Sequence, residues 1–357
     1  MKTKILHITS VHSHKDTRIY MKECKSLSKK FEVHLINPNY TGKIDEVNFH
    51  RINFFKNKFL RILSSWIFVL PKSLNFNYKI IHFHDPELML AIPIWKLFGK
   101  KVIYDVHENY VKQMEVKAYI PKTLKKILKT ILPKIEVFFS KMVDGISIVH
   151  KDLNLNLNKL NKHVVVSNAP ILDYDFIQKP RKKQFCYVGL ISEERGLYVI
   201  AKVLQKLQVK FVIAGKFSNK KFEKKMLKLH NVSYKGYLNL EQKVDLISES
   251  VCGSCTFLPI EHHLVSNPNK IYEYLNYGTP VICSNFQSYK DVIPEDKSFI
   301  YYCDITNEND VLITVKNIIS KSDNQINEQG KLGNLFIAKN YNWNIEEKKL
   351  FELYERL

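Results

Sequence analysis

The chain has 357 residues, of which 45% are hydrophobic and 12% aromatic, and it carries a formal net charge of +20. This length suits two domains of roughly 150 to 200 residues. No apolar run approaches the roughly 18 residues that cross a bilayer, so we expect a cytoplasmic, unprocessed protein. Only six of the 55 basic residues are arginine, which disfavours base readout of nucleic acid but leaves attraction to phosphate or anionic membranes open.

Apolar strands alternate with longer amphipathic stretches, which predicts parallel sheets with crossover helices. The strands expected in the first half are Lys4 to Thr9, Glu32 to Asn37, Lys79 to Phe83, Lys101 to Val106, Gly145 to Val149 and Val164 to Ser167. The pattern restarts with Phe185 to Val188, Lys210 to Ala214, Val232 to Lys235, Val251 to Leu258 and Pro280 to Ser284.

The expected fold is α/β, with two doubly wound, Rossmann-like domains. Residues 1–167 are predicted to form the first domain, 168–184 a hinge, 185–340 the second domain, and 341–357 a helix that packs back on the first. Two such domains place the carboxyl ends of their strands around a shared cleft, where ligands of these sheets bind.

The loop after the first strand, SVHSHKDTRIY, contains no Gly-x-Gly, which makes an NAD enzyme improbable. It contains Asp16 and Arg18 at the start of an expected helix. These residues are either a helix cap with a solvated arginine or part of a loop that reaches into the cleft.

Two later strand ends, HFHDPEL and YDVHENY, carry histidines and carboxylates where a parallel sheet binds its ligands. His84 and His107 are therefore candidate cleft residues, and Glu108 lies beside the second. Metal binding would need a third ligand held in geometry, which His84, Asp85 and His107 on adjacent strands could supply, but we expect no metal ion here.

In the second half, YVGLISEERG places Gly189 after a strand and Arg195 at the start of the next helix. Such an arginine could hold phosphate oxygens, or it could pair with Glu193 or Glu194 on the surface. Lys216 follows the next strand and offers a second cation.

The segment NPNKIYEYLNYGTPVICS, residues 267–284, predicts a helix with Pro268 as its first residue, capped by Ser266 or Asn267 and stopped by Gly278. The free amides near Asn269 and Lys270 could receive a diphosphate, and Glu273, one turn later, a ribose. An ordinary helix with a surface glutamate is the alternative.

Six cysteines are scattered through the chain, and only Cys252 and Cys255 form a C-x-x-C pair. Since this pair lies in an apolar strand without a second pair at zinc spacing, we expect buried, reduced thiols.

Together, the Arg195 loop, the Gly215–Lys216 strand end and the helix bearing Lys270 and Glu273 resemble the donor-binding domain of retaining glycosyltransferases with the GT-B fold, family 4 type. Over nearly the whole chain, SVHSHKDTRIYMKECKSLSKKFEVHLI, HFHDPELMLA, YDVHENY and PNKIYEYLNYGTPVICSN look like members that build bacterial surface polysaccharides such as lipopolysaccharide or capsule.

The resemblance implies roles for individual residues. Arg195 would hold the donor diphosphate, Glu273 would correspond to the second acid of the family's Glu-x7-Glu motif, and His107 would face the donor sugar. The complete set of candidates adds Gly189, Lys216, Asn269 and Lys270 for the donor and Asp16, Arg18 and His84 for the acceptor side.

Two positions depart from the family pattern. The first acid of the motif falls at Val265, where Glu261, His262 or His263 could substitute. The family's frequent arginine after the loop glycine is Leu190 here.

The expected activity is transfer of a sugar, with retention, from a nucleoside-diphosphate sugar to a lipid-linked saccharide, without cofactor or metal and without nucleic acid as partner. A nucleotide-sugar epimerase or phosphorylase of the same fold is the alternative, followed by a basic nucleic-acid-binding module.

Residues 117–142 combine leucines and isoleucines at helical spacing with clustered lysines, and residues 55–73 form a second basic, apolar segment. Both predict peripheral binding to the cytoplasmic face of an anionic membrane through the first domain. A crossover helix that packs its apolar stripe on the sheet is the alternative for residues 117–142.

Overall fold

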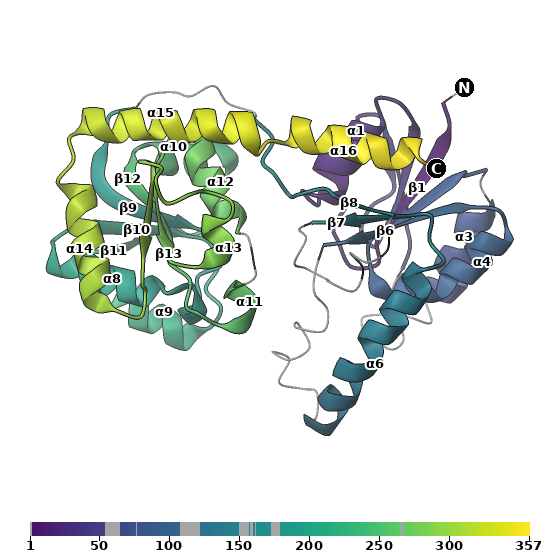
Figure 1. The fold of residues 1–357 in the computed structure, drawn as a ribbon, viewed down its shortest axis with the longest axis horizontal. Coiled ribbons are helices and arrows are strands. Elements are labelled where there is room, and N and C mark those ends of the chain that lie inside the picture. The colour runs from purple at the N-terminus through teal and green to yellow at the C-terminus, as the bar shows by residue number, and fades with distance from the viewer. Residues whose placement is uncertain are drawn as a thin grey trace. The chain divides into compact units, whose positions relative to one another are not determined.

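The computed structural model describes residues 2–53, 65–75, 77–107, 122–149, 157, 160, 162–172, 179–264, 266 and 268–357. The chain divides into two compact units. The N-terminal unit contains Met1–Asn168 and Trp343–Leu357, and the C-terminal unit contains Ala169–Asn342. Each unit is a parallel sheet with flanking helices, as expected (Figure 1).

The N-terminal sheet has the strand order β3-β4-β2-β1-β5-β6-β7-β8. Only the edge pair β3–β4 is antiparallel. The strands are β1 (Lys4–Ile8), β2 (Glu32–Asn37), β3 (Gly42–Ile44), β4 (Val47–Arg51), β5 (Ile80–Phe83), β6 (Lys101–Val106), β7 (Gly145–Ile148) and β8 (His163–Val165).

The helices of this unit include the C-terminal helix of the chain. They are η1 (Ile19–Cys24), α1 (Lys25–Leu27), η2 (Ser65–Val69), α3 (Leu70–Asn75), η3 (Pro86–Ala91), α4 (Ile92–Leu97), α6 (Lys122–Ser140) and α16 (Trp343–Glu355). The buried indole of Trp343 donates to Ser26 Oγ at 2.8 Å, and Glu346 accepts the backbone N–H of Ser167 at 2.7 Å. These contacts fix α16 in the N-terminal unit.

The C-terminal sheet has the order β11-β10-β9-β12-β13-β14, with every neighbouring pair parallel. Its strands are β9 (Lys182–Val188), β10 (Lys210–Ala214), β11 (Val232–Tyr234), β12 (Ser250–Cys255), β13 (Val281–Ser284) and β14 (Ile300–Cys303).

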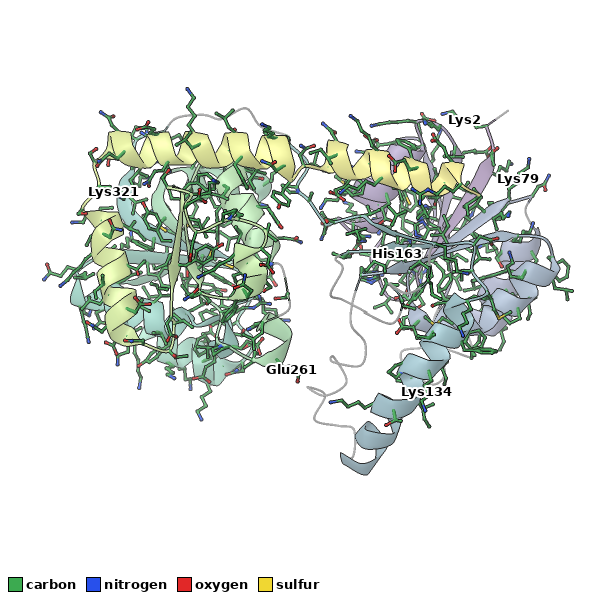
Figure 2. All side chains as sticks on the ribbon, viewed as in Figure 1. Lys2, Lys79, Lys134, His163, Glu261 and Lys321 are labelled. Carbon is green, nitrogen blue, oxygen red and sulfur yellow. The ribbon has the colours of Figure 1, made fainter. Side chains whose placement is uncertain are left out.

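The helices of the C-terminal unit connect these strands, and side chains fill the space between them and the sheet (Figure 2). They are η5 (Glu193–Arg195), α8 (Leu197–Lys206), α9 (Lys220–Leu227), α10 (Leu240–Ser248), α11 (Glu261–Leu264), α12 (Asn269–Asn276), α13 (Gln287–Lys290), α14 (Glu308–Ile319) and α15 (Asp323–Asn340). All six cysteines of the chain are buried and free, which agrees with the sequence prediction.

Several element boundaries differ from the sequence predictions. The sequence prediction omitted β3, β4 and β14. Strand β9 begins at Lys182, inside the expected hinge, because polar residues at its start still pair with Ser250 of β12. Helix α12 begins at Asn269, with Pro268 in an extended conformation as its cap, so the predicted start was wrong by one residue.

Within the described residues, no helix combines the length and the apolar character needed to cross a lipid bilayer.

Candidate active site

Each sheet contains a point where the strand order reverses. In the N-terminal unit the chain proceeds outward from β1 in one direction and from β5 in the other, and in the C-terminal unit from β9 and from β12. Ligands of doubly wound sheets bind beyond the carboxyl ends of the strands at such a point. The candidate residues cluster at these strand ends.

Two glycines form the floor of the candidate donor site. Gly189 follows β9 with φ 139°, and Gly215 follows β10 with φ 126°. A Cβ at Gly215 would collide with the carbonyl oxygen of Gly189, and a Cβ at Gly189 would collide with the ammonium of Lys270. Glycine at both positions therefore allows the backbone turns and Lys270 to approach one another closely.

Lys270 packs against the backbone at the Gly189 turn. Its ammonium donates to the backbone carbonyl oxygen of Val188 and lies 4.8 Å from the centre of the Tyr187 ring. Burial lowers the pKa of Lys270, and the nearby charge of Glu273 acts in the opposite direction. An anionic ligand at the strand ends would stabilise the charged form of this lysine.

Arg195 lies on the neighbouring loop. Its guanidinium carbon is 4.2 Å from the centre of the Phe257 ring, and its Nε is buried without a hydrogen-bond partner in the described part of the chain. The alternative pairing with nearby acids does not occur, since Glu193 binds Lys225 and Glu194 accepts from Ser192. The Nε–H of Arg195 is therefore available to a ligand.

Glu273 is the acidic group of this cluster. Lys243 of α10 donates to its Oε1 at 2.6 Å, and 28% of the glutamate side chain is exposed. Among the residues that the structure describes, Oε2 has no hydrogen-bond partner. Glu273 can thus accept hydrogen bonds from a ligand through Oε2 while Lys243 binds Oε1.

The first turn of α12 has no side-chain cap from Pro268, and the amides of Asn269 and Lys270 have no hydrogen-bond partner among the described residues. Asn269 is exposed there, and Lys216 is exposed after Gly215. The structure thus brings Gly189, Lys270 and the start of α12 together, next to the end of β10.

In the N-terminal unit, Asp105 of β6 connects the candidate histidines. Its Oδ2 lies 3.1 Å from Nδ1 of His84 and 3.1 Å from Nδ1 of His107. Burial acts to raise the pKa of Asp105, but the charge of Arg18 and the histidine hydrogen bonds hold it well below the usual range. Because the carboxylate can then only accept, His107 donates its Nδ1–H to Asp105.

Arg18 is buried, not solvated. It contacts both oxygens of Asp105, at 3.1 and 2.7 Å, and donates to the carbonyl oxygen of Val166 and to Ser147 Oγ. His84 is fully buried as well. This placement favours a supporting role for Arg18 and His84 over direct contact with an acceptor.

Asp16 caps the helix that follows. It accepts the backbone N–H groups of Arg18 and Ile19 at 2.8 and 2.9 Å and lies 3.2 Å from Nδ1 of His12. Although burial acts to raise its pKa, these hydrogen bonds lower it to about 2. His12 in turn lies 3.1 Å from Nε2 of His107, so Asp16 and His107 belong to one chain of contacts.

Two family models match the chain. The model described as Glycosyltransferase Family 4 matches residues 18–168, and the model Glycosyl transferases group 1 matches residues 174–331. The chain is a GT-B glycosyltransferase of family 4 type. No curated protein matches it.

Solved structures show the same fold as this glycosyltransferase. A glycosyltransferase from Rickettsia africae ESF-5 is 14% identical, with TM-score 0.71, and the match covers 99% of this chain and 98% of that one. Sucrose-phosphate synthase from Thermosynechococcus elongatus is 13% identical, with TM-score 0.72 and the same coverage. The E. coli structure described as trehalose-6-phosphate bound with UDP-2-fluoro glucose is 9% identical, with TM-score 0.68 and 98% of both chains covered.

Sequence reasoning on this glycosyltransferase missed Asp105, Lys243 and Phe257. Asp105 could have been found, because it lies two residues before His107 and so belongs to the same face of the strand. No sequence signal connects Lys243 or Phe257 with the site, because each lies far along the chain from the residue that it contacts, Glu273 and Arg195 respectively.

Some candidates lie outside the described residues, namely Glu108, Val265 and Asn267, as does the side chain of His262. Of the proposed substitutes for the missing acid, Glu261 is exposed on α11. His263 is buried, with Nδ1 2.9 Å from the carbonyl oxygen of Leu258. Glu261 is thus the better placed of the two.

Proposed function

We propose that this glycosyltransferase moves a sugar from a nucleoside-diphosphate sugar to a saccharide hydroxyl, with retention of anomeric configuration. The observation that carries the proposal is the guanidinium of Arg195 on Phe257, whose buried Nε has no hydrogen-bond partner among the described residues and which is close in sequence to the Gly189 turn beside Lys270. The E. coli structure of the same fold was solved with UDP-2-fluoro glucose, which supports a nucleotide sugar as donor.

The main chemical task is to stabilise the departing diphosphate. Breaking the bond between sugar and phosphate passes through an oxocarbenium-like state, and fixed cations stabilise the charge that develops on the phosphate oxygens. Arg195, Lys216, Lys270 and the amides of the first turn of α12 would supply this stabilisation. Glu273 would accept hydrogen bonds from the ribose.

His107 would support the reacting sugar. Its Nδ1 is bound to Asp105, and its Nε2, on the opposite side of the ring, lies 3.1 Å from His12 Nε2. The acceptor hydroxyl would approach on the side of the leaving group and give its proton to a phosphate oxygen. No protein nucleophile is needed in this reaction.

The donor site is proposed to work without a metal ion. Diphosphate-bridging divalent ions are held by carboxylates, whereas the candidate residues here are mostly cationic. Magnesium or manganese that restores activity after chelation would contradict this part of the proposal.

The acceptor is proposed to be a polyprenyl-linked saccharide of surface polysaccharide synthesis, reached at the cytoplasmic leaflet. On α6, Ile131, Ile135 and Phe138 are exposed at helical spacing. Figure 2 shows Lys134 extending from the same helix, which continues through Pro133. Exposed Ile67 and Phe68 of η2 add apolar surface to this unit. Exposed apolar residues interspersed with lysines support peripheral binding to an anionic membrane.

A donor panel with and without acceptor tests the proposal. UDP-, GDP- and dTDP-sugars are incubated with the full chain in the presence or absence of a polyprenyl-diphosphate-linked saccharide, and products are identified by NMR. We expect acceptor-dependent release of nucleoside diphosphate and a product with the donor's anomeric configuration. Acceptor-independent conversion of the donor would instead indicate an epimerase, and an inverted product would refute retention.

A further inference from the structure

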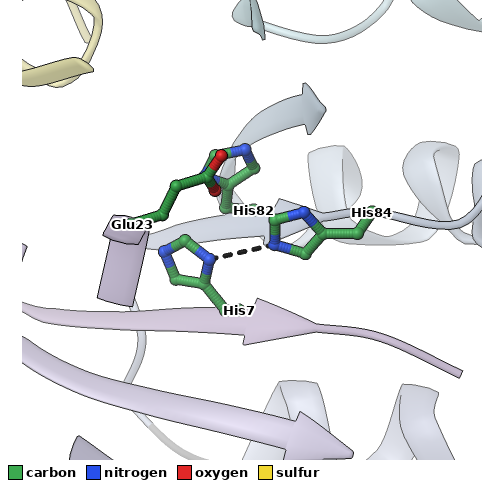
Figure 3. A group of neighbouring side chains, drawn as sticks. All are labelled: His7, Glu23, His82 and His84. Carbon is green, nitrogen blue, oxygen red and sulfur yellow. Dashed lines mark hydrogen bonds between the residues drawn. The ribbon is translucent and has the colours of Figure 1, made fainter. Parts of the chain in front are cut away.

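Three histidines share one face of the N-terminal sheet, beneath the strand ends of the candidate site. His7 of β1 lies directly opposite His82 of β5 in the parallel register. His84 follows two residues later and therefore points to the same side of the sheet. Figure 3 shows the three imidazoles together with Glu23, which comes from η1.

These four side chains are completely buried. One ligand atom of each, a ring nitrogen or a carboxylate oxygen, lies within 4.8 Å of the others, and His7 Nδ1 and His84 Nε2 are already 3.0 Å apart. Donor atoms around a tetrahedral zinc ion are about 3.3 Å apart, given bonds of about 2.0 Å. Small side-chain rotations would bring the four groups to this spacing.

Part of the cluster lacks partners. Within the described residues, His82 Nε2 and both oxygens of Glu23 have no hydrogen bond, although Glu23 lies 3.1 Å from Arg18 Nε. Buried polar atoms without hydrogen bonds are costly and therefore rare. A cation would supply the missing partner for both residues.

The neighbours orient the imidazoles as they do at metal sites. His84 contacts Asp105 through Nδ1, which leaves Nε2 toward the cluster. The hydroxyl of Tyr354 lies 3.1 Å from His7 Nε2 and 2.9 Å from His82 Nδ1.

We propose that His7, Glu23, His82 and His84 form a structural site for a divalent transition metal ion, with zinc as the best match. Imidazole nitrogens and carboxylate oxygens are both zinc ligands, and four of them closed off from solvent suit tetrahedral coordination, whereas magnesium prefers oxygen ligands. The ion would bind β1, β5 and η1 together. This site departs from the sequence-based expectation of no metal, because His7 and Glu23 lie far along the chain from His82.

The site is independent of the donor-binding proposal. Its ligands belong to the N-terminal unit, while Arg195, Lys270 and Glu273 belong to the other. The ion would act on the candidate site through His84, or through Glu23 and Arg18, and in both cases through Asp105, the carboxylate that also contacts His107.

Metal content and cobalt spectroscopy of the untagged, full-length protein test the proposal. Zinc per chain is measured after purification without chelator, and cobalt is then titrated into the metal-free protein. We expect one ion per chain and an intense visible cobalt spectrum typical of tetrahedral coordination. Clearly less than one zinc or cobalt ion per chain, or the weak spectrum of octahedral cobalt, would overturn the proposal. The four side chains would then be a hydrogen-bonded cluster without a metal ion.

Variants locate the ion. His82→Asn should weaken cobalt binding by at least about 100-fold, since loss of an outer partner alone costs about 10- to 100-fold. Tyr354→Phe keeps all four ligands and should weaken binding by about 10-fold or more. The matched control is His50→Asn, which alters another histidine pair on adjacent strands, His34 and His50, 2.8 Å apart. The assignment would be overturned if folded His82→Asn bound cobalt with wild-type affinity, or if His50→Asn lost as much cobalt affinity as His82→Asn.

Discussion

The guanidinium of Arg195 stacks on the Phe257 ring, with its central carbon 4.2 Å from the ring centre, and its Nε is buried without a hydrogen-bond partner among the described residues. The aromatic face stabilises the cation and fixes its plane without using any of its N–H donors. An arginine held in this way is prepared for an anionic ligand.

Replacement of Arg195 should therefore reduce transfer. Arg195→Ala should lower kcat/KM at least about tenfold, since a charge-assisted hydrogen bond contributes about 1.5 to 3 kcal/mol. Arg195→Lys should rescue only part of the loss because a point charge lacks the bidentate fork. Arg356→Ala, at an exposed ion pair with Glu352, serves as the control. Near-native rates in folded Arg195→Ala would remove this residue from the site.

Glu273→Ala should lower transfer by at least about tenfold as well, by loss of charge-assisted hydrogen bonds to the donor. Lys243→Met removes only the partner that holds the carboxylate and should have a smaller effect. The control is Glu193→Ala, which breaks an exposed pair with Lys225. Steady-state kinetics with the preferred donor distinguish these outcomes. A Glu273→Ala enzyme as active as the control would exclude the proposed ribose contact.

Donor affinity should decline with rising pH, and the decline should begin at a pH below the usual pKa range of lysine. Burial lowers the pKa of Lys270, so its ammonium loses the proton, and its attraction for phosphate, at a pH below the usual lysine range. For the same reason the charged lysine opposes folding, and the free energy of unfolding should rise as pH passes upward through the lowered pKa.

Titrations of the donor across alkaline pH test this expectation. Lys270→Met should bind the donor more weakly and lose this alkaline decline, whereas Lys225→Met, at an exposed lysine, should keep the wild-type profile. The same alkaline profile in Lys270→Met and in the wild type would show that another group titrates.

Membrane binding should depend on the lysines of α6. Lys125, Lys126 and Lys129 all changed to Glu should abolish sedimentation with anionic liposomes at low salt, since each surface-close lysine contributes about 1 kcal/mol. The same change at exposed Lys220, Lys221 and Lys224 of α9 is the matched control. Binding no stronger than to neutral liposomes, or binding that survives the α6 change in a folded variant, would refute the hypothesis.

Much of the fold could be predicted from the sequence because the central strands are continuous apolar runs. The expected ranges Glu32 to Asn37, Lys101 to Val106 and Lys210 to Ala214 agree with the structure residue by residue. Strand β4 was missed because Val47 and Phe49 alternate with polar residues over only five positions. Strand β14 was missed because its tyrosines are only half-buried.

The parts of the candidate site that depend on local sequence, such as turns and helix ends, could be predicted. Gly189, Lys270 and Gly278 occupy the turns and helix end that their residue types indicated. Contacts across the sheet were not predictable. Arg18 looked solvated beside a helix cap, yet its partner Asp105 lies 87 residues away, and this long-range ion pair buries it.

The most direct test of the donor site is a fluorescence titration of the full chain with UDP-, GDP- and dTDP-sugars, with a single-stranded oligonucleotide titrated at the same salt concentration. The account predicts saturable binding of at least one nucleotide sugar, weakened at least about tenfold in Arg195→Ala, and no comparable oligonucleotide binding. Failure of every nucleotide sugar to bind, together with tight oligonucleotide binding, would contradict it.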